Sequence, residues 1–356
     1  MHRRRKSRPG IAGNLVALVL GLVASLAVFE GMSRVAFPAW RDFHSGRFMT
    51  RTIVPGYPIL AVGVAGFDGG FAHNDGDFNV RIRLNDLGLR NDEPTSAAGD
   101  RIWVIGDSFM FGWGVERDDM LSSQLAAVGG RPTFNLASPG EGLCGYQALV
   151  ARMPKELRPS AMVVGITIEN DTGIIECKPA TAAELPPEEA NWSKTGIKRM
   201  LSAYFASYNV VSVTTKRIAP LRDVLVSLGV VERENQSHYN FDPARVEESV
   251  ASMVGEIAKL RALAPDVPFV ALMIPARTDL IDQDPVYRAV RERLGDALRQ
   301  AGHPVADPFA RLAAEGLGRV HFTHDGHWSP LGHRIAAEAV AETLAPLFAA
   351  TQEPAP

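Results

Sequence analysis

The chain has 356 residues, of which 46% are hydrophobic and 22% are charged, and its formal net charge is −3. This is the composition of ordinary globular protein, with room for one large domain or two small ones. A nearly balanced, slightly acidic chain lacks the basic surface that nucleic-acid binding requires. We therefore expect no nucleic-acid partner.

The amino terminus departs from this balance, because five of its first eight residues are basic and an uncharged apolar run follows over residues 11–29. At ~1.5 Å per residue that run spans about 28 Å, close to the hydrocarbon thickness of a bilayer. Basic residues before such a span predict a cytoplasmic tail, 1–10, and a transmembrane signal-anchor helix, 11–30, in the inner membrane. The rest of the chain would face the periplasm or the cell exterior. A signal peptide cleaved near residues 24–27 is the competing interpretation.

Residues 31–99 are expected to form a linker and an accessory region, in which Phe78–Leu84 alternates like a strand and a turn follows over 85–90. From residue 100 onwards, short apolar runs alternate with helical patterns. The expected strands are Ile102–Ile105, Thr133–Leu136, Ala161–Ile166, Pro268–Ile274 and Pro304–Ala306. The expected helices include Met120–Val128, Glu247–Leu263, Pro285–Ala301 and Pro330–Leu347. This order predicts an α/β fold, a three-layer αβα sandwich around a five-stranded parallel, flavodoxin-like sheet.

Residues 172–245 interrupt this alternation. Residues 179–187 have the composition of a loop, and residues 194–228 are largely apolar with helical spacing. Because connections of this length in a compact domain are usually functional, we expect an inserted cap beside the active site. The catalytic domain would then cover residues 100–350, and the tail 351–356 is expected to be disordered.

The chain has two cysteines, Cys144 and Cys177. Both would lie in loops that follow successive strands. In an oxidising compartment they can pair, so a disulfide and two free thiols are both compatible with the sequence.

The most informative segment is the end of the first expected strand, where Ile102–Ile105 stops at Gly106-Asp107-Ser108. Ligand sites in open α/β sheets lie outside the carboxyl ends of the strands, so this serine is well placed for chemistry. A serine nucleophile needs a base and a third group that orients the base. We expect Ser108 to be the nucleophile, His327 the base and Asp325 the orienting acid. Considered without His327 and Asp325, Ser108 fits the role of a helix N-cap as well as that of a nucleophile.

Four blocks in chain order resemble the SGNH (GDSL) hydrolase superfamily: Gly106–Phe109, Asn135–Gly142, Gly165–Asp171 and Asp325–His333. The resemblance implies an oxyanion hole made by the backbone N–H groups of Ser108 and Gly140 and the side-chain amide of Asn170. Gly140 as a turn glycine and Asn170 as a capping residue are the alternatives. Asp107 is expected to stabilise the turn.

One position departs from the common family pattern, because His324 stands three residues before His327 where an aspartate is usual. The carboxylate is at Asp325, and this Asp-x-His-Trp form resembles a membrane-anchored bacterial branch that includes alginate O-acetyltransferase-like proteins. Trp328 and Trp113 are expected to line an acyl or sugar pocket, with core packing as the alternative.

Four histidines, at 321, 324, 327 and 333, match no strong metal-ligand motif, and a metal would leave Ser108 unexplained. We therefore expect no metal and no other cofactor.

Together these features predict an envelope serine esterase or O-acyltransferase that acts on acetyl or other short acyl esters of a glycan. Its expected partners are the acylated glycan or another ester substrate, the membrane, and proteins of exopolysaccharide assembly. A lipid or short-chain carboxylesterase and a catalytically silent glycan-binding module are the alternatives.

Overall fold

The computed structural model describes residues 11–181, 184, 194–229, 241–281 and 284–350. Its centre is a parallel five-stranded sheet with the strand order β6-β5-β7-β8-β9. The strands are β5 (Ile102–Ile105), β6 (Thr133–Asn135), β7 (Ala161–Thr167), β8 (Phe269–Ile274) and β9 (Val305–Ala306). All residues of β5, β7 and β8 are buried, which explains their continuous apolar runs. The predicted fold class is confirmed.

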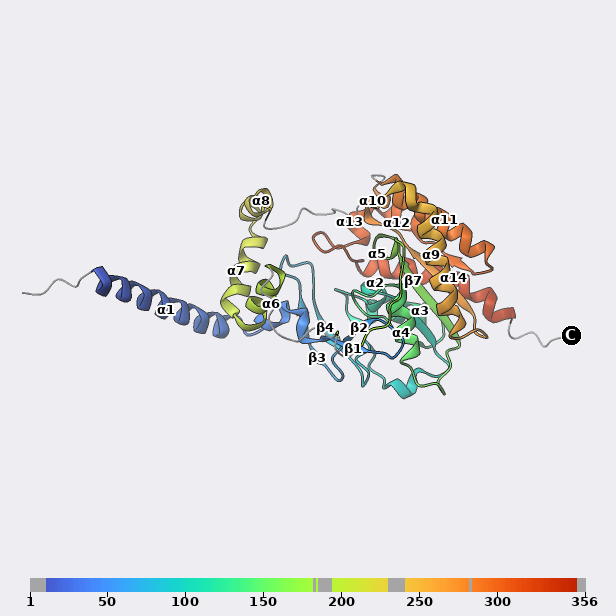
Figure 1. The fold of residues 1–356 in the computed structure, drawn as a ribbon, viewed down its shortest axis with the longest axis horizontal. Helices are drawn as coiled ribbons and strands as arrows, with labels where there is room; N and C mark the ends of the chain where they lie inside the picture. Colours follow the sequence, from blue (N-terminus) through green and yellow to red (C-terminus); the bar gives the residue numbers. More distant parts are fainter. Residues whose placement is uncertain (1–10, 182–183, 185–193, 230–240, 282–283, 351–356) are drawn as a thin grey trace, which may run out of the picture.

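Helices cover both faces of this sheet (Figure 1). The helices α3 (Leu121–Gly129) and α14 (Pro330–Ala350) pack together on one face. The other face carries α4 (Leu143–Ala151), α9 (Val246–Ala262) and α11 (Pro285–Gln300). Successive residues of β5 face opposite layers: Ile102 and Val104 join the α3–α14 core, whereas Trp103 and Ile105 join the other. Short helices α2 (Ser108–Phe111), α5 (Ile168–Asp171), α10 (Arg277–Leu280), α12 (Phe309–Glu315) and α13 (Leu317–Val320) complete the loops.

Two antiparallel hairpins precede the sheet. The first pairs β1 (Met49–Ile53) with β2 (Ile59–Gly63), and the second pairs β3 (Asp68–Ala72) with β4 (Asn79–Arg83). The predicted strand at 78–84 corresponds to β4. The turn between β3 and β4 contributes polar side chains to the site described below, and the backbone of β2 supports one of its loops.

The amino-terminal helix α1 (Ile11–Ala36) projects away from the sheet domain with its apolar side chains exposed (Figure 1). By length and composition it could cross a membrane. It ends at Ala36 rather than at the expected residue 30, because Glu30 and Arg34 form an ion pair four residues apart that continues the helix beyond the apolar run.

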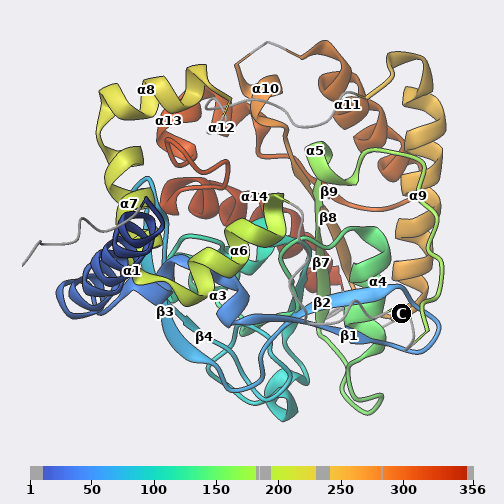
Figure 2. The same cartoon turned by 60° about the vertical axis from the view of Figure 1, so that its left-hand side comes forward.

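The insertion forms three helices, α6 (Lys194–Tyr204), α7 (Ala206–Arg217) and α8 (Ala219–Ser227). The helix α7 packs against the end of α1 and the short 3-10 helix at Trp40–Phe43, and α6 packs against that 3-10 helix and the one at Ser45–Arg47. The helix α8 packs against α7. In Figure 2, where the α1 side comes forward, α7 lies beside α1. Much of the expected loop at 179–187 and the tail at 351–356 lie outside the described residues.

Cys144 and Cys177 form a disulfide. Cys144 lies in the first turn of α4, and Cys177 lies in the loop after α5. The disulfide therefore joins the two segments that follow the loops of Gly140 and Asn170. Of the two alternatives that the sequence left open, the structure contains the disulfide.

Candidate active site

The turn that presents Ser108 is built from its immediate neighbours. A Cβ on Gly106 would stand 2.4 Å from Cγ of Met110, so only glycine permits this approach. Oδ1 of Asp107 accepts the backbone N–H of Phe109 at 3.0 Å and thereby caps α2, as expected for a residue that stabilises the turn. Ser108 is the first residue of α2 and is 8% exposed. The N-cap alternative for Ser108 is wrong, because Asp107 holds that position.

His327 and Asp325 meet this serine from the other end of the chain. Nε2 of His327 lies 2.7 Å from Oγ of Ser108, and Nδ1 lies 2.5 Å from Oδ1 of Asp325. A carboxylate only accepts hydrogen bonds, so Nδ1 carries the imidazole proton and Nε2 is left to accept from the serine hydroxyl. The three side chains form one hydrogen-bonded chain, and this is the arrangement that activates a serine.

The environment of Asp325 favours its charged form. Burial opposes ionisation, but the adjacent His327 ring and its two hydrogen bonds outweigh burial and hold the pKa of Asp325 well below its usual range. Asp325 is therefore an anion throughout the neutral range, as an orienting acid must be.

A second aspartate, which the sequence analysis did not identify, fixes the segment that carries Asp325. Oδ2 of Asp77 accepts the backbone N–H groups of His324 at 2.8 Å and of Asp325 at 2.6 Å. Oδ1 of Asp77 lies 2.7 Å from Nδ1 of His324. The side chain of His73 stands behind this pair, with Nε2 3.9 Å from Oδ2 of Asp325. Asp77 follows Gly76 in a turn, and its only sequence signal is that of a turn residue.

Asn170 lies beside the turn of Ser108. Its Nδ2 donates a hydrogen bond of 2.8 Å to Oδ2 of Asp107. An amide carries two N–H donors, so one remains for another acceptor. Burial raises the pKa of Asp107, while the Asn170 hydrogen bond acts in the opposite direction.

Gly140 lies in an exposed turn with φ +81°, a conformation that favours glycine. The loop that contains it is tied to the nucleophile turn, since the N–H of Ser138 donates to the carbonyl of Gly106 at 3.0 Å. It is also tied to β2: Oε1 of Glu141 accepts the N–H of Ala61 at 2.6 Å, and Oγ of Ser138 donates to the Ala61 carbonyl at 2.7 Å. The β1–β2 hairpin thus supports the loop of Gly140.

The two tryptophans have different places. The expectation that Trp328 lines a pocket is wrong, because its side chain is fully buried and packs against Phe109 and His333. Its indole ring belongs to the α3–α14 core. Trp113 is half-buried, and its ring centroid lies 5.7 Å from that of His327. It is therefore at the site.

The other histidines are placed differently from one another. Burial lowers the pKa of His321 and of His333 to about 3, so both are neutral, and His324 pairs with Asp77. Within the described part of the chain, the one group with metal-ligand spacing is Cys144, Cys177 and Glu256, and its two sulfurs are joined in the disulfide.

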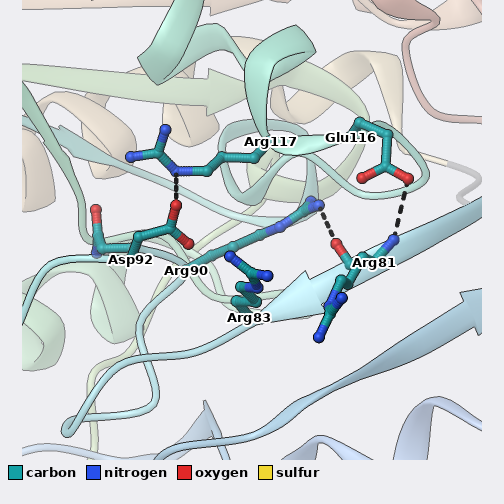
Figure 3. Close-up of a pocket in the computed structure, with 7 residues that line it drawn as sticks. Arg81, Arg83, Arg90, Asp92, Glu116 and Arg117 are labelled. Atoms are coloured by element: carbon teal, nitrogen blue, oxygen red, sulfur yellow. Dashed lines mark hydrogen bonds and ion pairs between the residues drawn. The ribbon is translucent and has the colours of Figure 1, made fainter.

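A separate cavity of about 130 Å³ is lined by charged residues of β4 and nearby loops (Figure 3). Its arginines have partners: Arg81 pairs with Asp68, and Arg117 with Asp92. The buried Arg90 donates to the carbonyls of Gly112 and Val115, so the predicted turn at 85–90 supports the segment after α2. Burial lowers the pKa of Arg90 to about 10, at which it is still charged at neutral pH.

The model of the GDSL-like Lipase/Acylhydrolase family matches residues 104–335, which is more than half of the chain. The chain therefore belongs to this family, whose members are SGNH-type hydrolases that act on esters.

The solved structures that match this chain share little sequence with it. A lipolytic protein of the G-D-S-L family from Veillonella parvula is 12% identical, with 68% of this chain and 96% of that chain covered and a TM-score of 0.37. A carbohydrate esterase family 2 enzyme from Corynascus thermopiles is 14% identical, with 85% and 88% covered and a TM-score of 0.39. A family two carbohydrate esterase from Clostridium thermocellum is 13% identical, with 70% and 64% covered and a TM-score of 0.37. No curated protein matches the sequence.

Proposed function

We propose that the protein is a membrane-anchored serine esterase or O-acyltransferase in which Ser108, His327 and Asp325 form the catalytic triad. The observation that carries this proposal is the hydrogen-bonded chain from Asp325 through His327 to Oγ of Ser108. Oγ of Ser108 attacks the ester carbonyl while Nε2 of His327 takes its proton. The imidazolium then protonates the leaving alcohol, and an acyl-enzyme remains.

The same residues complete the second half of the reaction. His327 takes a proton from water or from a sugar hydroxyl, which attacks the acyl-enzyme. The imidazolium then returns this proton to Oγ of Ser108 as the ester bond to the serine breaks. Attack by water gives an esterase, and attack by a sugar gives an acyltransferase. Asp325 stays ionised throughout and stabilises the imidazolium, in keeping with its low pKa.

We propose an oxyanion hole formed by the backbone N–H groups of Ser108 and Gly140 and the second N–H of the Asn170 amide. The support is positional: Asn170 is bonded to Asp107, and the loop of Gly140 is bonded to Gly106, so both segments adjoin the nucleophile turn. Each donor of this kind contributes about 3–4 kcal/mol to transition-state stabilisation.

For the substrate we propose an acetyl or other short acyl ester of a glycan. Two features support it. The Asp325-x-His327-Trp328 pattern resembles that of alginate O-acetyltransferase-like proteins, and Trp113 places an aromatic ring beside His327, where a sugar face can pack. An acylated exopolysaccharide and its assembly proteins are the corresponding partners.

We further propose that α1 is an uncleaved anchor in the inner membrane, with the sheet domain in the periplasm. The basic residues before α1 favour a cytoplasmic amino terminus. The disulfide between Cys144 and Cys177 is typical of an oxidising compartment, so it supports a periplasmic location of the sheet domain.

The test is the release of acetate from 4-nitrophenyl acetate and from an O-acetylated polysaccharide by the full chain and by Ser108→Ala. We expect hydrolysis by Ser108→Ala to fall to the uncatalysed background. Ser123→Ala, which removes a half-buried hydroxyl on α3, is the matched control and should retain full activity. An isotope-labelled glycan acceptor in the same assay separates transfer from hydrolysis. Full activity in Ser108→Ala would refute the triad.

A silent glycan-binding module requires no hydrogen-bonded serine, histidine and aspartate. If the protein were such a module, Ser108→Ala would bind polysaccharide as the parent chain does, and neither would release acetate.

A further inference from the structure

The insertion exposes more large apolar side chains than the sheet domain does. Within the described residues after α1, eight of these exposed side chains lie on α6, α7, α8 and their connections, whereas the rest contributes Val64, Val128 and Ile174. The eight are Ile197, Tyr204, Phe205, Val211, Ile218, Leu221, Val224 and Leu228. Exposed apolar side chains concentrated in one segment make that segment a candidate interaction surface. We refer to residues 194–228 as the α6–α8 module.

The contacts of this module fix its position relative to α1. Glu30 of α1 accepts the backbone N–H groups of Ala206 and Ser207, the first two residues of α7. Arg34 donates to the carbonyl of Tyr204 at 2.9 Å. These contacts lie directly after the apolar run of α1, so the module meets α1 where that helix would leave a bilayer.

The same junction carries the residue types of a membrane–water interface. The guanidinium groups of Arg34 and Arg41 lie 5.2 Å and 4.9 Å from the ring centroid of Trp40. Nδ2 of Asn209 on α7 donates to the Trp40 carbonyl at 2.9 Å. Trp40 is only 5% exposed and packs inside the junction, whereas Arg34 and Arg41 are exposed, as basic side chains at the headgroup level are. The α6–α8 module therefore forms hydrogen bonds with Arg34 and Trp40 at this junction.

The helix α8 has the pattern of a helix that lies on a lipid surface. Leu221 and Val224 on α8 and Leu228 directly after it are spaced three and four residues apart, so they share one face. These side chains are 45%, 54% and 69% exposed. A short helix with one unburied apolar face suits the boundary between headgroups and acyl chains.

The charge of the module matches an anionic surface. Residues 194–228 contain six basic residues and one acidic residue, Asp223, within a chain whose net charge is −3. Lys216, Arg217 and Arg222 contact the loop of residues 73–75, whereas Lys198 and Arg199 on α6 are exposed. Basic residues close to a bilayer are attracted to anionic lipids, and they reinforce the burial of an apolar face. We propose that the α6–α8 module docks onto the anionic phospholipid surface of the membrane that α1 crosses. The inference rests on the proposed membrane anchor.

Docking would also fix the candidate site relative to the membrane. Arg217, at the end of α7, donates to the carbonyls of His73 and Asn74. Lys216 lies 3.4 Å from Asp75. The loop that these residues hold continues to Asp77, which fixes the segment of Asp325. The module thus joins the lipid surface to the loop that supports the candidate triad.

The test uses the full chain in phospholipid vesicles, with an environment-sensitive fluorophore on a single introduced cysteine. The native cysteines are joined in a disulfide and do not react. The labels replace Leu221 or Val224 on α8, and the controls are Val128→Cys on α3 and Leu18→Cys on α1, which are 48% and 69% exposed before substitution. Vesicles contain phosphatidylcholine alone or with phosphatidylglycerol, and nitroxide lipids act as quenchers.

We expect the labels at 221 and 224 to shift to the blue and to be quenched by nitroxide lipids, more strongly with phosphatidylglycerol. The label at 128 should be insensitive to lipid, and the label at 18 should be quenched in both vesicles. Labels at 221 and 224 that behave like the one at 128, with position 18 quenched, would overturn docking and leave the anchor intact. A blue shift without lipid quenching would overturn it in favour of contact with a second copy. An unquenched label at 18 would refute the anchor, and docking with it.

Discussion

The two halves of the candidate triad are held in place in different ways. Ser108 is positioned by residues within a few positions of itself: Gly106 permits the close turn, and Asp107 caps the helix that follows. The segment with Asp325 and His327 depends on Asp77, which binds it from 247 and 248 residues away in sequence. The nucleophile is thus a local construction, whereas the acid–base pair is assembled by contacts between distant segments.

This difference shows which catalytic side chains a short sequence motif can position by itself. A strand followed by a capped turn fixes the hydroxyl wherever that sequence occurs in an α/β sheet. A histidine on a loop can serve as a base only if the loop is held at hydrogen-bond distance from the serine. The accessory hairpin β3–β4 provides that support by presenting the turn that contains Asp77 between its strands.

The largest effect should come from the acid itself. Asp325→Asn keeps the shape of the side chain but removes the charge that stabilises the imidazolium, and it favours the wrong imidazole tautomer. We expect kcat for ester hydrolysis to fall by about 10⁴. Steady-state kinetics at neutral pH checks this, with the thermal unfolding midpoint as the control for folding. A loss smaller than tenfold would remove Asp325 from the triad.

The disulfide is a second long-range support, because it links the segments after Gly140 and Asn170. It closes a loop of 33 residues between Cys144 and Cys177. Replacement of both cysteines by serine should lower the free energy of unfolding by about 3–4 kcal/mol, the value expected for a loop of this length. Urea unfolding of both proteins measures this difference. An unchanged midpoint, or equal sensitivity of both proteins to reductant, would contradict it.

Asp77 tests the comparison most sharply. Asp77→Ala leaves the N–H groups of His324 and Asp325 without their acceptor, which should cost about 1–3 kcal/mol of stability. A misplaced acid–base pair should also lower kcat about 10- to 100-fold, with little change in KM.

The matched control for Asp77 is Asp68→Ala on β3, which removes an exposed carboxylate paired with Arg81 and should change neither quantity. If both variants keep full kcat, the segment of Asp325 and His327 does not need Asp77 to hold its position. It would then be positioned locally, as Ser108 is, and the difference described above would be contradicted.

The last effect leaves the triad intact and concerns the support of the Gly140 loop. Burial raises the pKa of Glu141 to about 7, although the N–H of Ala61 and the charge of Arg51 oppose this. A carboxyl with a raised folded-state pKa is stabilising while it is protonated. That contribution is complete below its unfolded pKa of 4.5 and decreases as the pH rises towards 7.

Glu141→Gln should therefore remove a loss of stability on the order of 3 kcal/mol between pH 4.5 and pH 7.5. Urea unfolding at these two values, compared between the parent chain and the variant, gives the difference. We expect the free energy of unfolding of the parent chain to fall more than that of the variant between the two pH values. The opposite order would contradict the prediction.

The parts of the fold that follow from local patterns were predictable. Five apolar runs predicted the five strands, three of which are buried along their whole length, and Ser108 stood at the end of one of these. The helix α4 was not among the expected helices. Nearly all of its residues are buried, so it lacks the amphipathic periodicity that identifies a helix.

The parts of the site that depend on tertiary contacts were not predictable. Asp77 and His73 lie in a turn-rich segment, and their relation to Asp325 exists only when the β3–β4 hairpin packs against the loop after α13. Trp328 follows His327 directly, and nothing in the sequence separates a residue that faces substrate from one that faces the core. The pairing of Cys144 with Cys177 likewise required the positions of α4 and of the loop after α5.

The central claim is that Ser108 is a nucleophile activated by His327. The most direct measurement is the intact mass of the protein after exposure to a fluorophosphonate, followed by mapping of the modified peptide. We predict one adduct per chain, located on Ser108, that is absent from Ser108→Ala and lost or strongly slowed in His327→Ala. A folded protein that gains no adduct, or that is modified equally fast in His327→Ala, would contradict the account.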